Sequence, residues 1–149
     1  MSILEKKRLK CKLINHLLKN GNKKTCENIL LKSLKNIQKT SLKPYKKVVK
    51  IAVINSASIF RIVKLKQKKR KKKSVKEIPT FILNNFERIS WSLKVILHYS
   101  KQQNANNFYK KLKQELIINS KNKGNSVDKK NELHKQILPK KRLLLYFRW

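Results

Sequence analysis

Residues 59–83 read IFRIVKLKQKKRKKKSVKEIPTFIL, the one part of this 149-residue chain with a clear strand pattern. Residues 59–66 and 75–83 are rich in β-branched and aromatic side chains, which favour strands. Pro79 has no backbone N–H to donate and is typical of an edge strand. Six consecutive cations, residues 68–73, separate the two segments. The pattern predicts a β-arm over about 59–83, a two-stranded hairpin that leaves the body of the protein at a basic tip.

Apolar side chains recur at helical spacing on both sides of this arm. Three stripes precede it and three follow it, so the expected fold class is mainly α: a bundle of about six helices with a protruding two-stranded β-hairpin. The stripe residues are Leu9, Leu13, Ile14, Leu17 and Leu18; Ile29, Leu30, Leu34 and Ile37; Val48, Val49, Ala52 and Val53; Ile89, Leu93, Ile96 and Leu97; Phe108, Leu112, Leu116 and Ile117; and Leu133 and Ile137.

Capping and breaking residues predict where these helices begin and end. Expected N-caps are Thr25 for the second helix, Asn84 or Asn85 for the fourth, and Ser126 or Asp128 for the sixth. Expected stops are Asn20-Gly21, the loop 40–44, Gly124 after the fifth helix and Pro139 in the sixth. An apolar segment, residues 143–149, ends the chain.

The charge balance is the strongest functional signal. Forty Lys and Arg face seven Asp and Glu, the formal net charge is +33, and the sequence pI is about 10.6. With 40% hydrophobic residues the chain has enough material for one folded domain, residues 1–149. A charge of this size repels itself in the compact state, and a polyanion relieves that repulsion. The composition therefore indicates nucleic-acid binding.

The sequence offers little material for catalysis, cofactors or metals. The seven acids are scattered among lysines, which suggests local ion pairs. His16, His98 and His134 fall on three different predicted helices without ligand-like spacing, and Cys11 and Cys26 read as small apolar residues on helix faces. No apolar run reaches the length of a membrane span. We expect no enzyme activity, no cofactor, no metal site and no membrane association.

The cations gather in four clusters: Lys23-Lys24, residues 68–73, Lys129-Lys130 and Lys140-Lys141-Arg142. Three of the four are expected in loops or at helix starts, where backbone N–H groups also meet phosphate. A lysine run is often only a solvated surface, but the repetition favours a protein seated on folded RNA. Two alternatives use the same charges: a sequence-indifferent, nucleic-acid-compacting protein of an organelle, and an amphipathic protein on a membrane surface.

Several motifs in order along the chain resemble the small-subunit ribosomal protein seven family. The clearest is residues 122–135, NKGNSVDKKNELHK, similar to the family's Asn-Lys-Gly, Val, basic cluster and acid–apolar–His series. Residues 146–149, YFRW, resemble its aromatic–Arg–Trp signature, and Ile78-Pro79 falls where the family has Val-Pro. Residues 14–27 are similar to its Asn, Asp-Gly and Lys-Lys-Ser-Thr-Ala-Glu pattern. The resemblance covers roughly residues 12–149.

The resemblance implies a structural constituent of the small ribosomal subunit that binds the 3′ domain of its rRNA and nucleates assembly of the head. Other head proteins would be neighbours, and the β-arm would lie near the mRNA and exit-site tRNA path. The clusters and the resemblance together assign rRNA binding to Lys23, Lys24, Lys64, Lys66, Lys68, Lys69, Arg70, Lys71, Lys72, Lys73, Lys76, Arg88, Lys123, Lys129, Lys130, Lys140, Lys141, Arg142 and Arg148. Arg148-Trp149 has an equal claim to a structural role, with Trp149 packed on the body.

The sequence departs from the family pattern in ways that suggest an organellar form. The basic N-terminal arm is reduced to Lys6, Lys7, Arg8 and Lys10, lysines replace glycines at the hairpin tip, and Glu87-Arg88 stands where paired arginines are common. Lys, Asn and Ile, whose codons consist of A and T, dominate the chain. We therefore expect a protein encoded in an A+T-rich organelle genome, most plausibly mitochondrial, with no transit peptide and with free cysteines.

Overall fold

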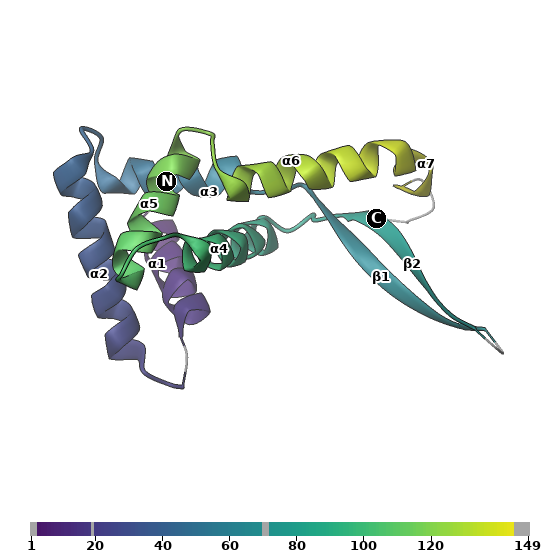
Figure 1. The fold of residues 1–149 in the computed structure, drawn as a ribbon, viewed down its shortest axis with the longest axis horizontal. Coiled ribbons are helices and arrows are strands. Elements are labelled where there is room, and N and C mark those ends of the chain that lie inside the picture. Colours follow the sequence, from purple (N-terminus) through teal and green to yellow (C-terminus); the bar gives the residue numbers. More distant parts are fainter. Residues whose placement is uncertain (1–2, 19, 70–71, 145–149) are drawn as a thin grey trace.

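The protein is a helical body from which a long β-hairpin protrudes (Figure 1). The computed structural model describes residues 3–18, 20–69 and 72–144, with side chains described outside 3–8, 65–69, 72–76, 141 and 143. Within those ranges the elements are α1 (Ile3–Leu17), α2 (Lys23–Thr40), α3 (Tyr45–Ser56), β1 (Phe60–Lys69), β2 (Lys72–Phe81), α4 (Asn85–Gln102), α5 (Phe108–Ser120), α6 (Asn125–Ile137), a 3₁₀ turn η1 (Leu138–Lys140) and the short α7 (Lys141–Leu144). The predicted fold class is confirmed.

The core lies around α5, which contacts α2, α3 and α4. Leu112 and Leu116 of α5 are completely buried, as are Ile37 of α2 and Leu93 and Ile96 of α4. Side chains three and four residues apart share one face of a helix, so the predicted apolar stripes of α1 to α5 meet in one cluster. The sixth stripe is separate from it: Ile137 is buried, but neither it nor Leu133 belongs to the cluster. The stripes are confirmed except at their ends, where Leu18 remains 40% exposed.

The hairpin lies within the predicted range of 59–83, but its strands extend further into the lysine run than predicted. Its antiparallel register runs from Phe60 opposite Phe81 to Lys69 opposite Lys72, so the strands include most of the lysine run that was expected to form the tip. Backbone hydrogen bonds of an antiparallel ladder do not depend on side-chain type, which allows pairing to continue through lysines. Pro79 lies opposite Ile62, in a two-stranded sheet in which each strand is an edge.

The N-cap of α4 was predicted correctly, and the N-cap of α2 was not. Asn84 caps α4, and its side chain accepts a hydrogen bond from the backbone N–H of Phe86. The cap of α2 is Asn22, not Thr25. Thr25 lies in the first turn instead, where its hydroxyl donates to the carbonyl of Asn22 at 2.7 Å. The helix begins earlier because the Asn20-Gly21 turn already reverses the chain, with both residues at positive φ.

The link between α5 and α6 also differs from the prediction. Gly124 is the N-cap of α6, with φ 99° and ψ 165°, and not the stop of α5. Asn122, at φ 57°, takes the left-handed conformation that follows α5. Neither Ser126 nor Asp128 caps α6, because both lie inside its first turn. The short link places the start of α6 directly against the end of α5.

Helix α6 ends at Ile137, and Pro139 lies in the 3₁₀ turn that follows, as predicted. Proline cannot donate the next helical hydrogen bond, so the chain changes direction before α7. Residues 145–149 of the expected apolar end segment lie outside the described residues. None of the helices in the described ranges combines the length and the apolar character needed to cross a membrane.

Candidate nucleic-acid interface

Cations from two separate elements meet at the hairpin through one acid. Glu77 of β2 forms an ion pair with Lys64 of β1 at 3.3 Å and with Lys140 of η1 at 3.7 Å. The three side chains are between 38% and 68% exposed, so they face solvent while held in place. Two lysines around one carboxylate leave a net positive charge at this position. The structure thus brings together two predicted RNA-binding residues, Lys64 and Lys140, that are 76 positions apart.

Arg88 lies in the first turn of α4, where the chain returns from the hairpin (Figure 1). Its Nη1 donates to Oδ1 of Asn85 at 3.5 Å. Its Nε is buried and has no hydrogen-bond partner among the described residues. A buried donor without an acceptor is costly to the folded state. Beside it, Arg61 of β1 pairs with Glu87 at 3.9 Å, a contact that the sequence did not indicate.

The two predicted lysines of α6 have different surroundings. Lys129 pairs with Glu132 one turn later, at 3.1 Å, and both side chains are exposed. Lys130 is partly buried, and its Nζ donates to the backbone carbonyl of Asn55 at 2.9 Å. That bond ties α6 to α3, so Lys130 has a structural role as well as a positive charge. The expected local pairing of acids with lysines is correct for Glu132, whose partner is Lys129.

The remaining predicted cations with described side chains are spread out. Lys23 and Lys24 are exposed at the start of α2, at the end of the body far from the hairpin (Figure 1). Lys123 is exposed in the α5–α6 link, and Arg142 is exposed on α7. The structure therefore separates Lys23 and Lys24 from the group around the hairpin and α6.

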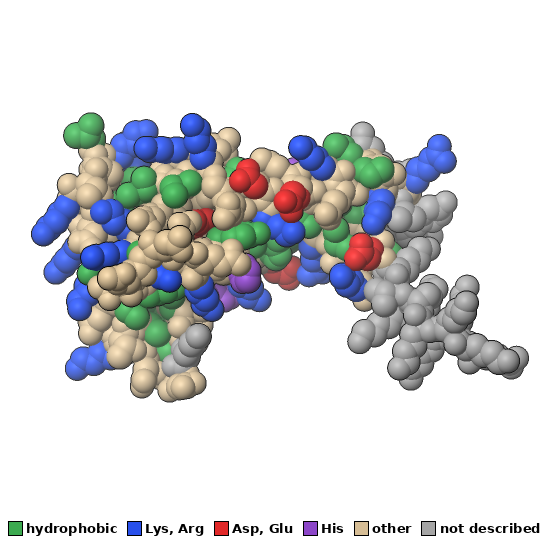
Figure 2. Space-filling model, in the orientation of Figure 1, with side chains coloured by type: hydrophobic (Ala, Val, Ile, Leu, Met, Phe, Trp, Pro, Cys, Tyr) green, Lys and Arg blue, Asp and Glu red, His purple; other side chains and the backbone are tan. Residues whose placement is uncertain are grey.

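The other predicted cations have side chains outside the described residues: Lys66, Lys68, Lys69, Arg70, Lys71, Lys72, Lys73, Lys76, Lys141 and Arg148. For those between 66 and 69 and between 72 and 76, the described backbone places the residues along the hairpin. Figure 2 shows further Lys and Arg side chains over most of the visible face, including the edge formed by α2. Positive charge is thus not confined to the four sequence clusters.

Glu115 is an acid in the core rather than a member of a local ion pair, so the sequence interpretation is wrong for it. It is completely buried, and its carboxylate accepts hydrogen bonds from Gln103 Nε2 at 2.8 Å, from Asn119 Nδ2 at 3.2 Å and from the hydroxyl of Ser126. The network joins the end of α4, α5 and the first turn of α6. A signal was present, because position 115 falls on the buried face of α5 with Leu112 and Leu116.

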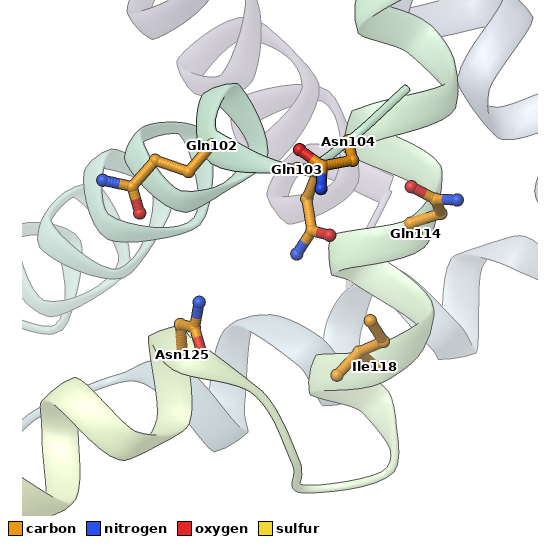
Figure 3. Close-up of a pocket in the computed structure, with 6 residues that line it drawn as sticks. All are labelled: Gln102, Gln103, Asn104, Gln114, Ile118 and Asn125. Carbon is orange, nitrogen blue, oxygen red and sulfur yellow. The ribbon is translucent and has the colours of Figure 1, made fainter. Parts of the chain in front are cut away.

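A hollow of about 320 Å³ lies beside this network, between the end of α4, α5 and the start of α6 (Figure 3). Five side-chain amides line it, from Gln102, Gln103, Asn104, Gln114 and Asn125, together with Ile118. None of these lining residues is charged. The hollow belongs to the neutral support of α6 rather than to the cationic surface.

The histidines contact serine hydroxyls and aromatic rings: His134 lies against Phe60 and His98 against Tyr99. His16 Nε2 lies 2.7 Å from Ser90 Oγ, and His134 Nε2 lies 3.3 Å from Ser58 Oγ. Burial lowers the pKa of His16 below its ordinary value, and Lys94 and Lys12 lower it further. Burial also lowers the pKa of His134, with Lys130 adding to the effect.

The described residues contain no group of three or more His, Cys, Asp or Glu that could hold a metal ion. Cys26 is buried, as expected of an apolar residue on a helix face. Cys11 is exposed, so the same expectation is wrong there. The position lies on the solvent side of α1, opposite the buried Leu13 and Ile14.

Comparison with known proteins agrees with this architecture. The family described as ribosomal protein S7p/S5e matches residues 3–138. Among the relatives, small ribosomal subunit protein uS7c of Bigelowiella natans is 28% identical over 90% of this chain and 82% of its own length. The uS7c of Euglena longa is 32% identical over 85% of this chain and 68% of its own length. The uS7m of Reclinomonas americana is 27% identical over 93% of this chain and 83% of its own length.

These relatives include chloroplast and mitochondrial proteins, which supports an organellar ribosome without deciding between the two organelles. The matching family consists of structural, non-enzymatic proteins, so the prediction that the chain is not an enzyme is confirmed. The motifs quoted from the sequence and the helical body with its hairpin lead to the same assignment. The chain belongs to the ribosomal protein S7p/S5e family.

Proposed function

We propose that this chain is a single-domain structural constituent of the small subunit of an organellar ribosome and binds the 3′ domain of the small-subunit rRNA. There it nucleates assembly of the head beside other head proteins, with its hairpin near the mRNA and exit-site tRNA path. The observation that carries the proposal is the set of cations from β1, η1 and α4 at a hairpin that extends away from the body (Figure 1).

The hairpin supports this function because an isolated hairpin of this kind is only marginally stable without a binding partner. A two-stranded ribbon is marginal in water, and this one contains six consecutive cations that repel one another. Binding to phosphates removes the repulsion and releases counterions. Lysine is suited to phosphate contact rather than to reading bases, so the arm would fix the position of the protein on folded RNA.

Arg88 supports the same surface from the side of α4. Its side chain is partly exposed at the start of α4, where its positive charge can attract a phosphate. Lys64 and Lys140 are already oriented by Glu77, so less side-chain freedom is lost when they bind. These three cations are the best-supported members of the proposed interface.

The test compares two sets of six substitutions with the same change in charge. One variant replaces residues 68–73 of the arm with glutamine. The control replaces six exposed lysines of the α2–α3 face, namely Lys32, Lys35, Lys39, Lys43, Lys46 and Lys50. Filter binding to transcribed small-subunit rRNA and to unrelated duplex DNA is measured for both.

We expect the arm variant to lose rRNA affinity far more than the control, with little difference between the two on DNA. Equal losses on every nucleic acid would favour the second candidate, a sequence-indifferent compacting protein. The observation in favour of that candidate is the cationic surface beyond the arm in Figure 2.

We further propose a mitochondrial location, on the basis of the A+T-biased composition and the mitochondrial relative. Fractionation of the source cells, with detection by an antibody against this chain, tests it. Enrichment with the mitochondrial small subunit is the expected result. Enrichment in plastids would contradict the location but not the ribosomal role.

A further inference from the structure

A second hollow, of about 420 Å³, lies at the opposite end of the body from the hairpin, where α1, α2, α4 and α5 converge. Its walls are mostly apolar and include Ile29 of α2, Leu97 of α4 and the ring of Phe108 at the start of α5. Cavities of this size and character accept small planar groups, because burying their faces is favourable. The aromatic ring adds a surface on which another ring can stack.

Polar groups surround the mouth of this hollow. Asn20 and Asn22 line it with two amides, which offer hydrogen bonds of both polarities, and His16 lines it with an imidazole whose Nε2 already lies 2.7 Å from Ser90 Oγ. The cap residue Asn22 makes no capping hydrogen bond with its side chain, so its amide is not engaged by α2. An apolar floor with a few polar groups at its edge is the arrangement that recognises a ring with a polar rim.

The charge around the mouth specifies what carries that ring. Lys101 lines the hollow, Lys23 and Lys24 follow Asn22 directly, and all three are exposed. None of the lining residues is an acid. By contrast, the amide hollow of Figure 3 has no cation among its lining residues. An aromatic ring attached to a negatively charged group therefore fits the hollow beside Phe108 better than the amide hollow.

We propose that this hollow receives one unpaired nucleobase of the bound RNA, stacked against Phe108, while Lys101, Lys23 and Lys24 contact the flanking phosphates. Sequence-specific proteins recognise RNA mainly through such splayed-out bases. The inference rests on the proposed rRNA binding and gives a role to Lys23 and Lys24, which lie far from the hairpin surface. It also makes the contact two-sided, with the arm at one end of the body and a base-holding site at the other.

The test uses the full chain bound to the transcribed 3′ domain of the small-subunit rRNA, with base-specific chemical probing. Ile29→Trp fills the hollow, and Leu31→Trp is the matched control, because Leu31 lies on the same helix, is 44% exposed and does not line the hollow. We expect one unpaired nucleotide that is protected by the wild type and by Leu31→Trp to become reactive with Ile29→Trp, while the protection caused by the arm remains.

A second variant, Asn22→Asp, tests the site without the risk of misfolding. Aspartate caps a helix as well as asparagine does and suits the positive end of α2, but it places a negative charge at the mouth. We expect the same nucleotide to lose protection. Unchanged protection at every nucleotide in both variants would overturn the inference while the proposed function stands. No footprint from the wild-type protein would instead refute the proposed function itself.

Discussion

Replacing Gly124 with alanine tests how helix α6 is held against α5. Gly124 has φ 99° and ψ 165°, a backbone conformation that only glycine adopts readily. A Cβ built there would lie 2.6 Å from Cγ2 of Ile118 and 3.5 Å from Oδ1 of Asn119. The substitution therefore combines backbone strain with a steric overlap, and both act at the N-terminus of the helix that carries Lys129 and Lys130.

The magnitude follows from these two contributions. A non-glycine residue in this region costs roughly 1–3 kcal/mol, and forcing an extra methyl into a packed contact costs roughly 1–3 kcal/mol more. Alanine also lowers the conformational entropy of the unfolded chain, which favours folding by about 0.4–1 kcal/mol and offsets part of this penalty. We expect Gly124→Ala to lower the free energy of unfolding by about 2–5 kcal/mol, or the melting temperature by roughly 5–15 °C.

Gly21→Ala is the matched control. Gly21 also has a positive φ, 75°, but a Cβ there would meet nothing within 4 Å. Its penalty is thus limited to the backbone, about 1 kcal/mol. Urea denaturation followed by circular dichroism, in enough salt to screen the net charge, measures both variants. An equal loss of unfolding free energy in the two variants would refute the reasoning. A second test adds Ile118→Ala to Gly124→Ala, because the smaller side chain removes the overlap; no recovery of stability in this double variant would also refute it.

Three further predictions follow from other parts of the structure. Glu115→Gln puts an amide N–H among three hydrogen-bond donors, so it should lower the free energy of unfolding by about 1–3 kcal/mol, whereas Asp128→Asn, at an exposed acid, should change it little in the same denaturation assay. Added salt should stabilise the isolated protein, because shortening the Debye length from about 30 Å at 0.01 M to about 3 Å at 1 M screens the repulsion within a +33 chain; a Tm that falls with salt would contradict this. The pKa values of His16 and His134 are lowered in the folded protein from the ordinary value of 6.5. As the pH falls through about 6.5, the unfolded chain therefore binds more protons than the folded protein does, and the stability decreases. Denaturation between pH 7 and 5 should therefore show a smaller loss in the His16→Gln, His134→Gln double variant than in the wild type.

The features that the sequence predicted well are those that depend on local periodicity. Leu93, Ile96 and Leu97 had to share one face of α4, because residues three and four apart on a helix always do. The hairpin followed in the same way from the β-branched segments on either side of the lysine run. The motifs of the ribosomal protein family added order along the chain, and the family match bears that out.

The features that the sequence missed depend on distant neighbours. Gly124 looked like the end of α5, but the side chain of Ile118 packs where a Cβ would be and makes glycine necessary at the start of α6. From the sequence Glu115 was expected to form a local ion pair, but Gln103, which follows α4, and Ser126 of α6 donate hydrogen bonds to its buried carboxylate. For the interface, the sequence proposed the cations, but only the structure shows that Lys130 also bonds to α3 and that Glu77 holds Lys64 beside Lys140.

The most direct test of the central claim is to sediment an organelle lysate through a sucrose gradient and to sequence the RNA crosslinked to this protein. We predict that the protein migrates with the small ribosomal subunit and that its crosslinks group in the 3′ domain of the small-subunit rRNA. Crosslinks spread over unrelated RNA and DNA, in fractions away from ribosomes, would contradict the account and leave charge alone as the basis of binding.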